Sequence, residues 1–150
     1  LPVFTKRAKR RMIKHSKFLF FDVGVYRAIR PAGPLDRPEE LAGAACETLF
    51  FQEIKALNEA LDLGYSIYYW RASSGLEVDF VIYGNKGIKA FEIKRTGKIS
   101  RSMLAGLKAF LGDYPMAKAY FIYGGDRYMR EGDIEILPME KTLKTLRSIL

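Results

Sequence analysis

Two segments within residues 77–95 arrange acidic and basic side chains in a pattern suited to phosphate chemistry. Apolar stretches at residues 77–83 and 88–95 flank a Gly-Asn-Lys-Gly segment at residues 84–87, which is typical of a β-hairpin. With the central Asn-Lys pair at the tip of the turn, the two outer glycines pair and fix the register. That register places four charged side chains on one face of the hairpin: Glu77, Asp79, Glu92 and Lys94.

Two of these acids are predicted to lie directly opposite each other. Asp79 and Glu92 would be about 5 Å apart, a separation at which like charges repel. A cation is needed between them, either the ammonium group of Lys94 or a divalent ion such as Mg²⁺ or Mn²⁺ with oxygen ligands. A metal ion there would suit phosphodiester hydrolysis, and Lys94 would orient or deprotonate the attacking water or balance the developing charge.

A further acid comes from a long helix predicted over residues 39–62. Glu39 and Glu40 suit its positive end, and Gly64 follows it. At 100° per residue Glu47 lies about 40° from the centre of the apolar stripe, where a carboxylate is largely buried and needs a partner. Glu47 is therefore a candidate to complete the cluster. The stripe itself consists of Gly43, Phe50, Ile54, Leu57 and Leu61.

A structural interpretation of the same residues stays open. Glu77 and Glu92 can each form an ordinary ion pair with Lys94, and such pairs contribute little stability when exposed. An Asp followed by Glu-x-Lys is a short pattern that also arises by chance. Spacing alone therefore does not decide between a metal site and a charged strand end.

The remaining elements predict an α/β fold with a mixed central sheet and helices on both faces. From residue 39 the predicted order is α-β-β-β-α-β, followed by β-α. A strand is predicted at residues 17–22 and a short helix at residues 23–29, before a Pro-rich loop at residues 30–38. The later elements are a strand at 66–71, a helix at 100–111, strands at 117–123 and 134–137, and a helix from Pro138.

The net charge of +8 is concentrated near the N-terminus, where seven basic residues precede the first acid, Asp22. Residues 1–17 are therefore interpreted as a basic arm or junction, and residues 18–150 as the domain. The arm could contact nucleic-acid phosphates, or it could be a solvated connector or pack on a neighbour. The candidate nucleic-acid contacts are Arg7, Lys9, Arg10 and Arg11.

Several classes of protein are excluded or disfavoured by composition. Cys46 is the only cysteine, which excludes a disulfide scaffold or a zinc–thiolate site within one chain. His15 is the only histidine and lies far from the acids in sequence, so a Ser-His-Asp triad is not expected. No membrane span or signal peptide is visible, and a reducing cytoplasm is the simplest compartment. Residues 68–70 (Tyr-Tyr-Trp) could stack on bases, but core packing is favoured.

Several stretches resemble one known family. Residues 69–81, YWRASSGLEVDFV, resemble the W-R-x-x-x-G-x-E-V-D-F-V signature of the C-terminal DUF4143 domain of a prokaryotic AAA-type ATPase family. Residues 91–94, FEIK, resemble the E-[IV]-K strand that follows it. Residues 14–24, KHSKFLFFDVG, resemble that family's S-P-K-x-Y-F-x-D-x-G segment, and residues 43–53 resemble its helix pattern. Val78 stands where a PD motif has Pro, and no Pro separates Ser16 from Lys17.

The resemblance implies a restriction-endonuclease-like (PD-(D/E)XK) fold. It further implies a nuclease-type cluster of Glu47, Asp79, Glu92 and Lys94, and an upstream ATPase portion. The sequence starts with Leu-Pro rather than Met, which fits a fragment of such a longer chain. No G-x-x-x-x-G-K-[ST] loop is present, so no ATP hydrolysis is expected from this segment.

Three functions remain open at this point. The first is Mg²⁺- or Mn²⁺-dependent hydrolysis of DNA. The second is a non-catalytic module that binds nucleic acid or a partner. The third is an interaction domain that regulates the ATPase portion, with oligomerisation as one means.

Overall fold

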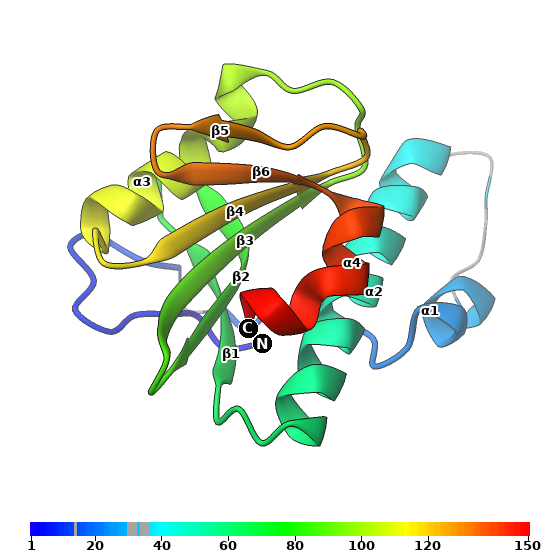
Figure 1. Ribbon diagram of the computed structural model, residues 1–150, viewed down its shortest axis with the longest axis horizontal. Helices are drawn as coiled ribbons and strands as arrows, with labels where there is room; N and C mark the ends of the chain where they lie inside the picture. The colour runs from blue at the N-terminus through cyan, green and yellow to red at the C-terminus, as the bar shows by residue number, and fades with distance from the viewer. Residues whose placement is uncertain (14, 30–32, 34–36) are drawn as a thin grey trace.

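A mixed six-stranded β-sheet forms the centre of the protein, and helices cover both of its faces (Figure 1). The computed structural model describes residues 1–13, 15–29, 33 and 37–150. The strand order is β1-β2-β3-β4-β6-β5, with antiparallel pairs at both ends and two parallel pairs, β3–β4 and β4–β6, between them. The strands are β1 (Ser66–Arg71), β2 (Glu77–Gly84), β3 (Gly87–Lys94), β4 (Lys118–Tyr123), β5 (Met129–Glu131) and β6 (Ile134–Pro138).

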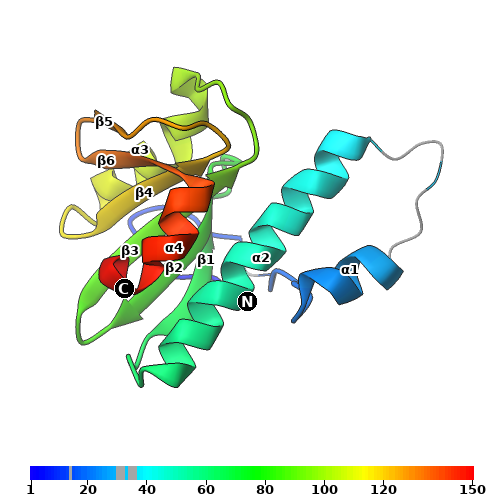
Figure 2. The ribbon, with the colours of Figure 1, turned by 45° about the vertical axis from the view of Figure 1, so that its right-hand side comes forward.

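The helices lie in two layers. A 3-10 turn, η1, and helix α3 pack on one face of the sheet, while α2 and α4 lie on the other. Figure 2 shows α1 on the side of α2 that points away from the sheet. The bounds are α1 (Val23–Ile29), α2 (Pro38–Ala60), η1 (Arg101–Leu104), α3 (Ala105–Asp113) and α4 (Met139–Ile149).

The predicted α/β class and element order are confirmed, with local differences. The short strand β5 was not predicted, and the helix predicted at residues 100–111 begins as a 3-10 turn. The strand predicted at residues 17–22 is wrong, because this segment is irregular and continues directly into α1. Most of the loop predicted at residues 30–38 lies outside the described residues.

The hairpin register is the predicted one. Gly84 pairs with Gly87, and the ladder continues to Phe80 opposite Phe91. Gly87 has a φ of 100°, a conformation that side-chain-bearing residues rarely adopt, so glycine suits this end of the turn. The register that brings Asp79 and Glu92 towards each other is therefore set by the turn.

A bulge in β2 changes which face its residues occupy. Tyr68 pairs with Val81 and Trp70 pairs with Val78, so Tyr69 alone lies opposite both Asp79 and Phe80. One extra residue on a strand shifts the alternation of its side chains from that point. The bulge therefore lies at the acid that the sequence singles out.

The prediction that Val78, Phe80 and Ile82 share one face is consequently wrong for Val78. Val78 belongs to the core beneath α3, whereas Phe80 and Ile82 belong to the core beneath α2 and α4. Strict alternation between residues 78 and 82 fails because of the extra residue in between.

Helix α2 is anchored against the sheet by part of the predicted apolar stripe. Phe50 and Ile54 are fully buried, and the ring of Phe50 packs against the rings of Phe80 and Phe91. In the last turn of α2, the side chain of Asn58 accepts a hydrogen bond from the backbone N–H of Tyr65 (2.9 Å) and donates one to the carbonyl of Tyr65 (2.8 Å). These contacts fix the helix relative to β1 and so fix the position of Glu47.

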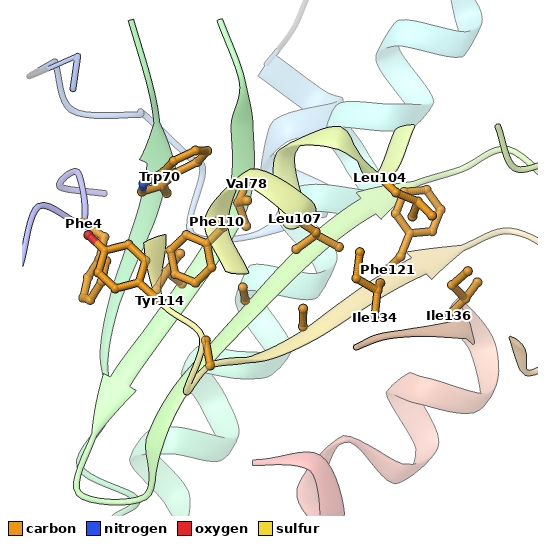
Figure 3. Packing of buried hydrophobic residues seen from close by; sticks show 14 of the residues in the cluster. Phe4, Trp70, Val78, Leu104, Leu107, Phe110, Tyr114, Phe121, Ile134 and Ile136 are labelled. Carbon is orange, nitrogen blue, oxygen red and sulfur yellow. The ribbon is translucent and has the colours of Figure 1, made fainter. Parts of the chain in front are cut away.

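The core beneath α3 is aromatic and includes a residue from the N-terminal segment. Figure 3 shows Phe4 beside Phe110 and Tyr114 of the α3 region, with Trp70 of β1 close by. Phe4 donates its backbone N–H to the carbonyl of Tyr69 (2.7 Å). Part of the segment at residues 1–17 therefore packs along β1, and the division into arm and domain stays a prediction about the longer chain.

Among the residues described, no helix is both long and apolar enough to cross a membrane.

Candidate functional site

Asp79 lies where strands β2 and β3 stop pairing. The ladder ends at Phe80 and Phe91, and the backbone N–H of Ile93 donates to Oδ2 of Asp79 at 2.8 Å. A side-chain oxygen thus replaces a backbone acceptor at the splayed end of the hairpin. Bulges commonly re-aim a side chain at the end of strand pairing, and here the re-aimed group is a carboxylate.

Lys94 joins the two predicted metal-binding acids. Its Nζ lies 2.6 Å from Oε1 of Glu92 and 3.7 Å from Oδ2 of Asp79. Two carboxylates therefore meet at one ammonium group, although the pairing of β2 with β3 ends at Phe80 and Phe91, one residue before Asp79 and Glu92. The predicted grouping of Asp79, Glu92 and Lys94 is observed.

Glu92 has a buried carboxylate oxygen that lacks a partner. Its side chain is 9% exposed, and Oε2 makes no hydrogen bond to any described residue. Burial, followed by the nearby charge of Asp79, raises the pKa of Glu92 to about 8, although Lys94 opposes the shift. A further cation beside Oε2 would favour the ionised carboxylate.

Lys17 is the main functional-site residue that the sequence analysis missed. Its Nζ lies 2.9 Å from Oε2 of Glu47, 3.3 Å from Oε1 of Glu77 and 3.3 Å from Oδ1 of Asp79. Its backbone N–H donates to the carbonyl of Leu1 (2.8 Å), which holds the segment in place. The sequence assigned Lys17 to a basic arm because nothing local indicates contacts with residues 30 to 62 positions away.

Glu47 reaches the cluster from the other layer of the fold, across from the hairpin. It extends from α2, and its ion pair is with Lys17. Burial and the charge of Asp79 raise the pKa of Glu47, and Lys17 acts in the opposite direction. The predicted inclusion of Glu47 in the cluster is observed, with Lys17 as the connecting cation.

The two lysines remain charged in this environment. Burial lowers the pKa of Lys17, but the carboxylates of Asp79 and Glu47 outweigh it and raise the pKa overall. The same effects act on Lys94: burial lowers its pKa, but the carboxylates of Asp79 and Glu92 outweigh burial and raise the pKa overall. Both ammonium groups therefore act as permanent positive charges at physiological pH.

Glu77 completes the cluster at its outer side. Besides Lys17 it contacts Arg71, with 3.5 Å between Nε of Arg71 and Oε2 of Glu77. The alternative ion pair predicted between Glu77 and Lys94 is replaced by these two contacts. Arg71 and Glu77 are also paired across β1 and β2, so this ion pair closes the end of the sheet.

An open pocket of about 500 Å³ adjoins the cluster between α2 and the end of β3. Glu47 and Lys94 both line it, and the exposed Arg95 adds a second positive charge. Gly43 of α2 also lines the pocket, and a Cβ there would have no heavy atom within 4 Å. The pocket is therefore wide enough at α2 to admit a polar ligand to Lys94.

Two carboxylates are the groups that could hold a metal ion. No set of three or more His, Cys, Asp or Glu side chains is arranged for a metal within the described part of the chain. Mg²⁺, however, commonly uses one or two protein carboxylates and completes its shell with water and phosphate. Asp79 and Glu92, with the free Oε2, fit that requirement.

The basic residues of the N-terminal segment lie elsewhere. Arg10 pairs with Asp113 at the end of α3, with 2.9 Å between Nε and Oδ2, and Lys9 donates to the carbonyl of Gly112 (3.4 Å). Arg7 and Arg11 are exposed. The side-chain contacts of Arg10 and Lys9 thus lead to α3 rather than to the carboxylate cluster.

Other residues considered from sequence have structural positions. Trp70 and Tyr69 are buried, which confirms core packing for them over base stacking. His15 is exposed, and its carbonyl accepts a hydrogen bond from the hydroxyl of Tyr69. Cys46 is half-buried in α2, where burial raises the pKa of its thiol.

Comparison with known families places most of the chain in a described family. A family model described as "Domain of unknown function (DUF4143)" matches residues 42–142, which include Glu47, the hairpin and all later strands. No curated protein matches the chain.

Proposed function

This chain belongs to the DUF4143 family, and we propose that its carboxylate cluster catalyses Mg²⁺- or Mn²⁺-dependent hydrolysis of phosphodiester bonds in DNA. The observation that carries the proposal is the free Oε2 of Glu92, buried beside Asp79 and Lys94. A buried carboxylate oxygen without a partner is costly in a purely structural ion-pair cluster. A divalent ion would satisfy it.

We assign distinct roles to the residues of the site. Asp79 and Glu92 would hold the ion, which would polarise the phosphate and activate a water molecule. Lys94, at the mouth of the pocket, would orient that water and balance the charge that develops on the phosphate. Glu47 lines the same pocket and would keep Lys17 in place.

The element order supports a nuclease-type fold as part of this proposal. The acids come from a splayed β-hairpin and the Glu47 helix packs on the adjacent face, an arrangement compatible with the restriction-endonuclease-like (PD-(D/E)XK) class. Under this proposal the domain accompanies an ATPase portion in the longer chain, as the sequence resemblance implies. Fold class alone does not determine activity, so the site carries the argument.

The direct test is cleavage of supercoiled plasmid and of labelled duplex DNA with Mg²⁺, Mn²⁺ or EDTA. We expect metal-dependent cleavage that falls by about 10²-fold or more in Asp79→Asn, Glu92→Gln and Lys94→Met. Asp133→Asn is the matched control, because this acid is exposed in the turn between β5 and β6. Circular dichroism and urea unfolding check that each variant is folded.

The same proteins are examined for metal binding without DNA. Wild-type protein should bind Mn²⁺, and Glu92→Gln should bind it at least tenfold more weakly than Asp133→Asn. A wild-type protein that binds no divalent ion and cleaves no DNA with any of them would contradict the proposal.

A second candidate function is DNA binding without cleavage, which the exposed basic surface favours. Arg7, Lys9 and Arg11 lie exposed on one stretch of chain beside β1. Lysine and arginine contacts to phosphate give affinity that falls with salt. Under this alternative, replacing the three by Gln weakens binding and reduces its salt dependence, while Asp79→Asn leaves binding unchanged. Binding that is insensitive to the triple change would rule it out.

A further inference from the structure

Lys17 occupies the position of a bound cation within the cluster. Its ammonium group lies within 3.3 Å of oxygens from three carboxylates, which belong to α2 and to two positions of β2. Few side chains make three such contacts, and the residue reaches the cluster from a segment outside the sheet. The contacts therefore depend on how the N-terminal segment packs on the domain.

The two oxygens of Asp79 face different cations. Oδ1 contacts Lys17, whereas Oδ2 contacts the N–H of Ile93 and lies 3.7 Å from Lys94. The cluster thus has two cation positions on either side of one carboxylate. Lys17 fills the first, between Asp79, Glu47 and Glu77, and the second lies beside Glu92 with its free Oε2.

The charges around the two cation positions indicate that they differ in their ability to accept a divalent ion. The Lys17 position has three acids around one ammonium group, and Glu77 has an additional contact with Arg71. Adding a divalent ion there would place it against a fixed positive charge at van der Waals distance. The Glu92 position has an unpaired oxygen and the ammonium group of a partly exposed Lys94.

We propose that Lys17 is a built-in substitute for a second metal ion, so that the site takes one divalent cation, beside Glu92, and excludes another between Asp79 and Glu47. This inference rests on the proposed metal-dependent function. Lys17 then acts as a positioning residue that holds Glu47 and Asp79 in place without contacting substrate. The reaction would belong to the one-metal type rather than the two-metal type of phosphodiester hydrolysis.

The test counts Mn²⁺ ions by equilibrium dialysis and isothermal titration, without DNA. Wild-type protein should bind one Mn²⁺ per chain, and Lys17→Met should bind two, because three carboxylates lose their cation. Glu47→Gln in the Lys17→Met background should return the number to one. Lys108→Met is the matched control, since the exposed Lys108 pairs with Glu131 away from the site, and this variant should bind one Mn²⁺.

The possible results separate the two proposals. One ion in both wild type and Lys17→Met would overturn the role of Lys17 and leave the metal-dependent function standing. Two ions in the wild type would also overturn it. No ion in either protein would reject the proposed function together with this inference.

Lys17→Met removes the ammonium group that three acids share and is expected to be less stable than wild type. Mn²⁺ should then raise its melting temperature more than that of the wild type, because the ion binds the folded state at one additional position. Lys17→Gln, which keeps hydrogen-bonding groups but no charge, gives a second measurement. An equal Mn²⁺-dependent shift in wild type and both variants would overturn the inference.

Discussion

At the scale of single residues, Asp79 has a structural task besides its proposed metal contact. Its Oδ2 accepts the backbone N–H of Ile93, a residue that is almost fully buried. A buried N–H that loses its acceptor costs about 1 to 3 kcal/mol. A loss of activity in Asp79→Ala would therefore combine a chemical effect with a structural one.

We expect Asp79→Asn to be more stable than Asp79→Ala by about 1 to 3 kcal/mol, because the amide oxygen can still accept from Ile93. Both variants lose the ion pair with Lys17, so that loss cancels in the comparison. Urea unfolding of the two proteins measures the difference. Equal stability of the two variants would mean that the hydrogen bond to Ile93 contributes nothing.

Lys89 is a buried charged residue outside the carboxylate cluster, on the face of the sheet that α4 covers. The residue is 5% exposed, and its Nζ donates to the hydroxyl of Tyr65 and to the backbone oxygen of Leu150 (2.8 Å). Burial, followed by the charges of Lys118 and Lys86, lowers the pKa of Lys89 from 10.5 to about 8. The folded protein therefore holds this proton more weakly than the unfolded chain.

Between pH 8 and 10.5 the unfolded chain binds more protons at Lys89 than the folded protein, so this group makes stability rise with pH. We expect the free energy of unfolding of wild type, relative to Lys89→Met, to increase across this range by on the order of 1 kcal/mol after solvent screening. Below pH 8 the difference should be constant. Urea titrations at several pH values measure it, and a difference that falls with pH would contradict the assignment.

At the scale of elements, one glycine permits α3 to approach the sheet next to the site. A Cβ at Gly106 would collide with the carbonyl oxygen of Glu77, the first residue of β2. Gly112 lies in the same helix, where a Cβ would meet only the guanidinium of Arg10 at 3.9 Å. Substitutions at Gly106 and Gly112 therefore distinguish the effect of close packing against β2 from the effect of helix propensity.

We expect Gly106→Ala to destabilise the protein by about 1 to 3 kcal/mol, because α3 must move away from β2. Gly112→Ala should be neutral or stabilising by up to about 1 kcal/mol, since alanine favours the helix. Thermal and urea unfolding of both variants test this. Unchanged stability of Gly106→Ala would show that the helix relaxes freely.

The sequence predicted most elements because their signals are local. The turn at residues 84–87 determines the hairpin register, and alternation with flanking glycines marks β2 and β3. The apolar and aromatic residues at 17–22 are typical of a strand, but this segment is irregular because it has no neighbouring strand to pair with among the residues that the structure describes. Strand β5 is three residues long, too short for a pattern.

The site was predictable only in part. Asp79, Glu92 and Lys94 follow from the hairpin register, and Glu47 follows from its place on the helix. Lys17 did not follow, because its ion pairs depend on how the N-terminal segment packs. The bulge at Asp79 is also not visible in the sequence, since residues 80–82 of β2 are apolar and buried on both faces and show no break in pattern.

At the scale of the whole molecule, the N-terminal segment connects the core, the sheet edge and the site. Its first residues pair with β1, through Phe4 N–H to Tyr69 O (2.7 Å) and Tyr69 N–H to Pro2 O (3.1 Å). An edge strand with unpaired backbone groups tends to pair with other chains, and this segment covers part of that edge. The same segment carries Lys17 into the cluster, so the stability of this packing and the geometry of the site are linked.

Phe4 anchors this segment, and its replacement should affect both the stability of the protein and the geometry of the site. It is 1% exposed, and its ring packs 5.2 Å from that of Tyr114 and 5.4 Å from that of Tyr68. Phe4→Ala should lower the free energy of unfolding by about 3 to 5 kcal/mol. Phe18→Ala is the matched control, because Phe18 is 79% exposed and should change stability by less than about 0.5 kcal/mol.

If the segment positions Lys17, loss of its anchor should also change metal binding. At a temperature where it remains folded, Phe4→Ala should bind additional Mn²⁺, as is expected of Lys17→Met. A Phe4→Ala variant as stable as Phe18→Ala would mean that the segment is not anchored by this residue.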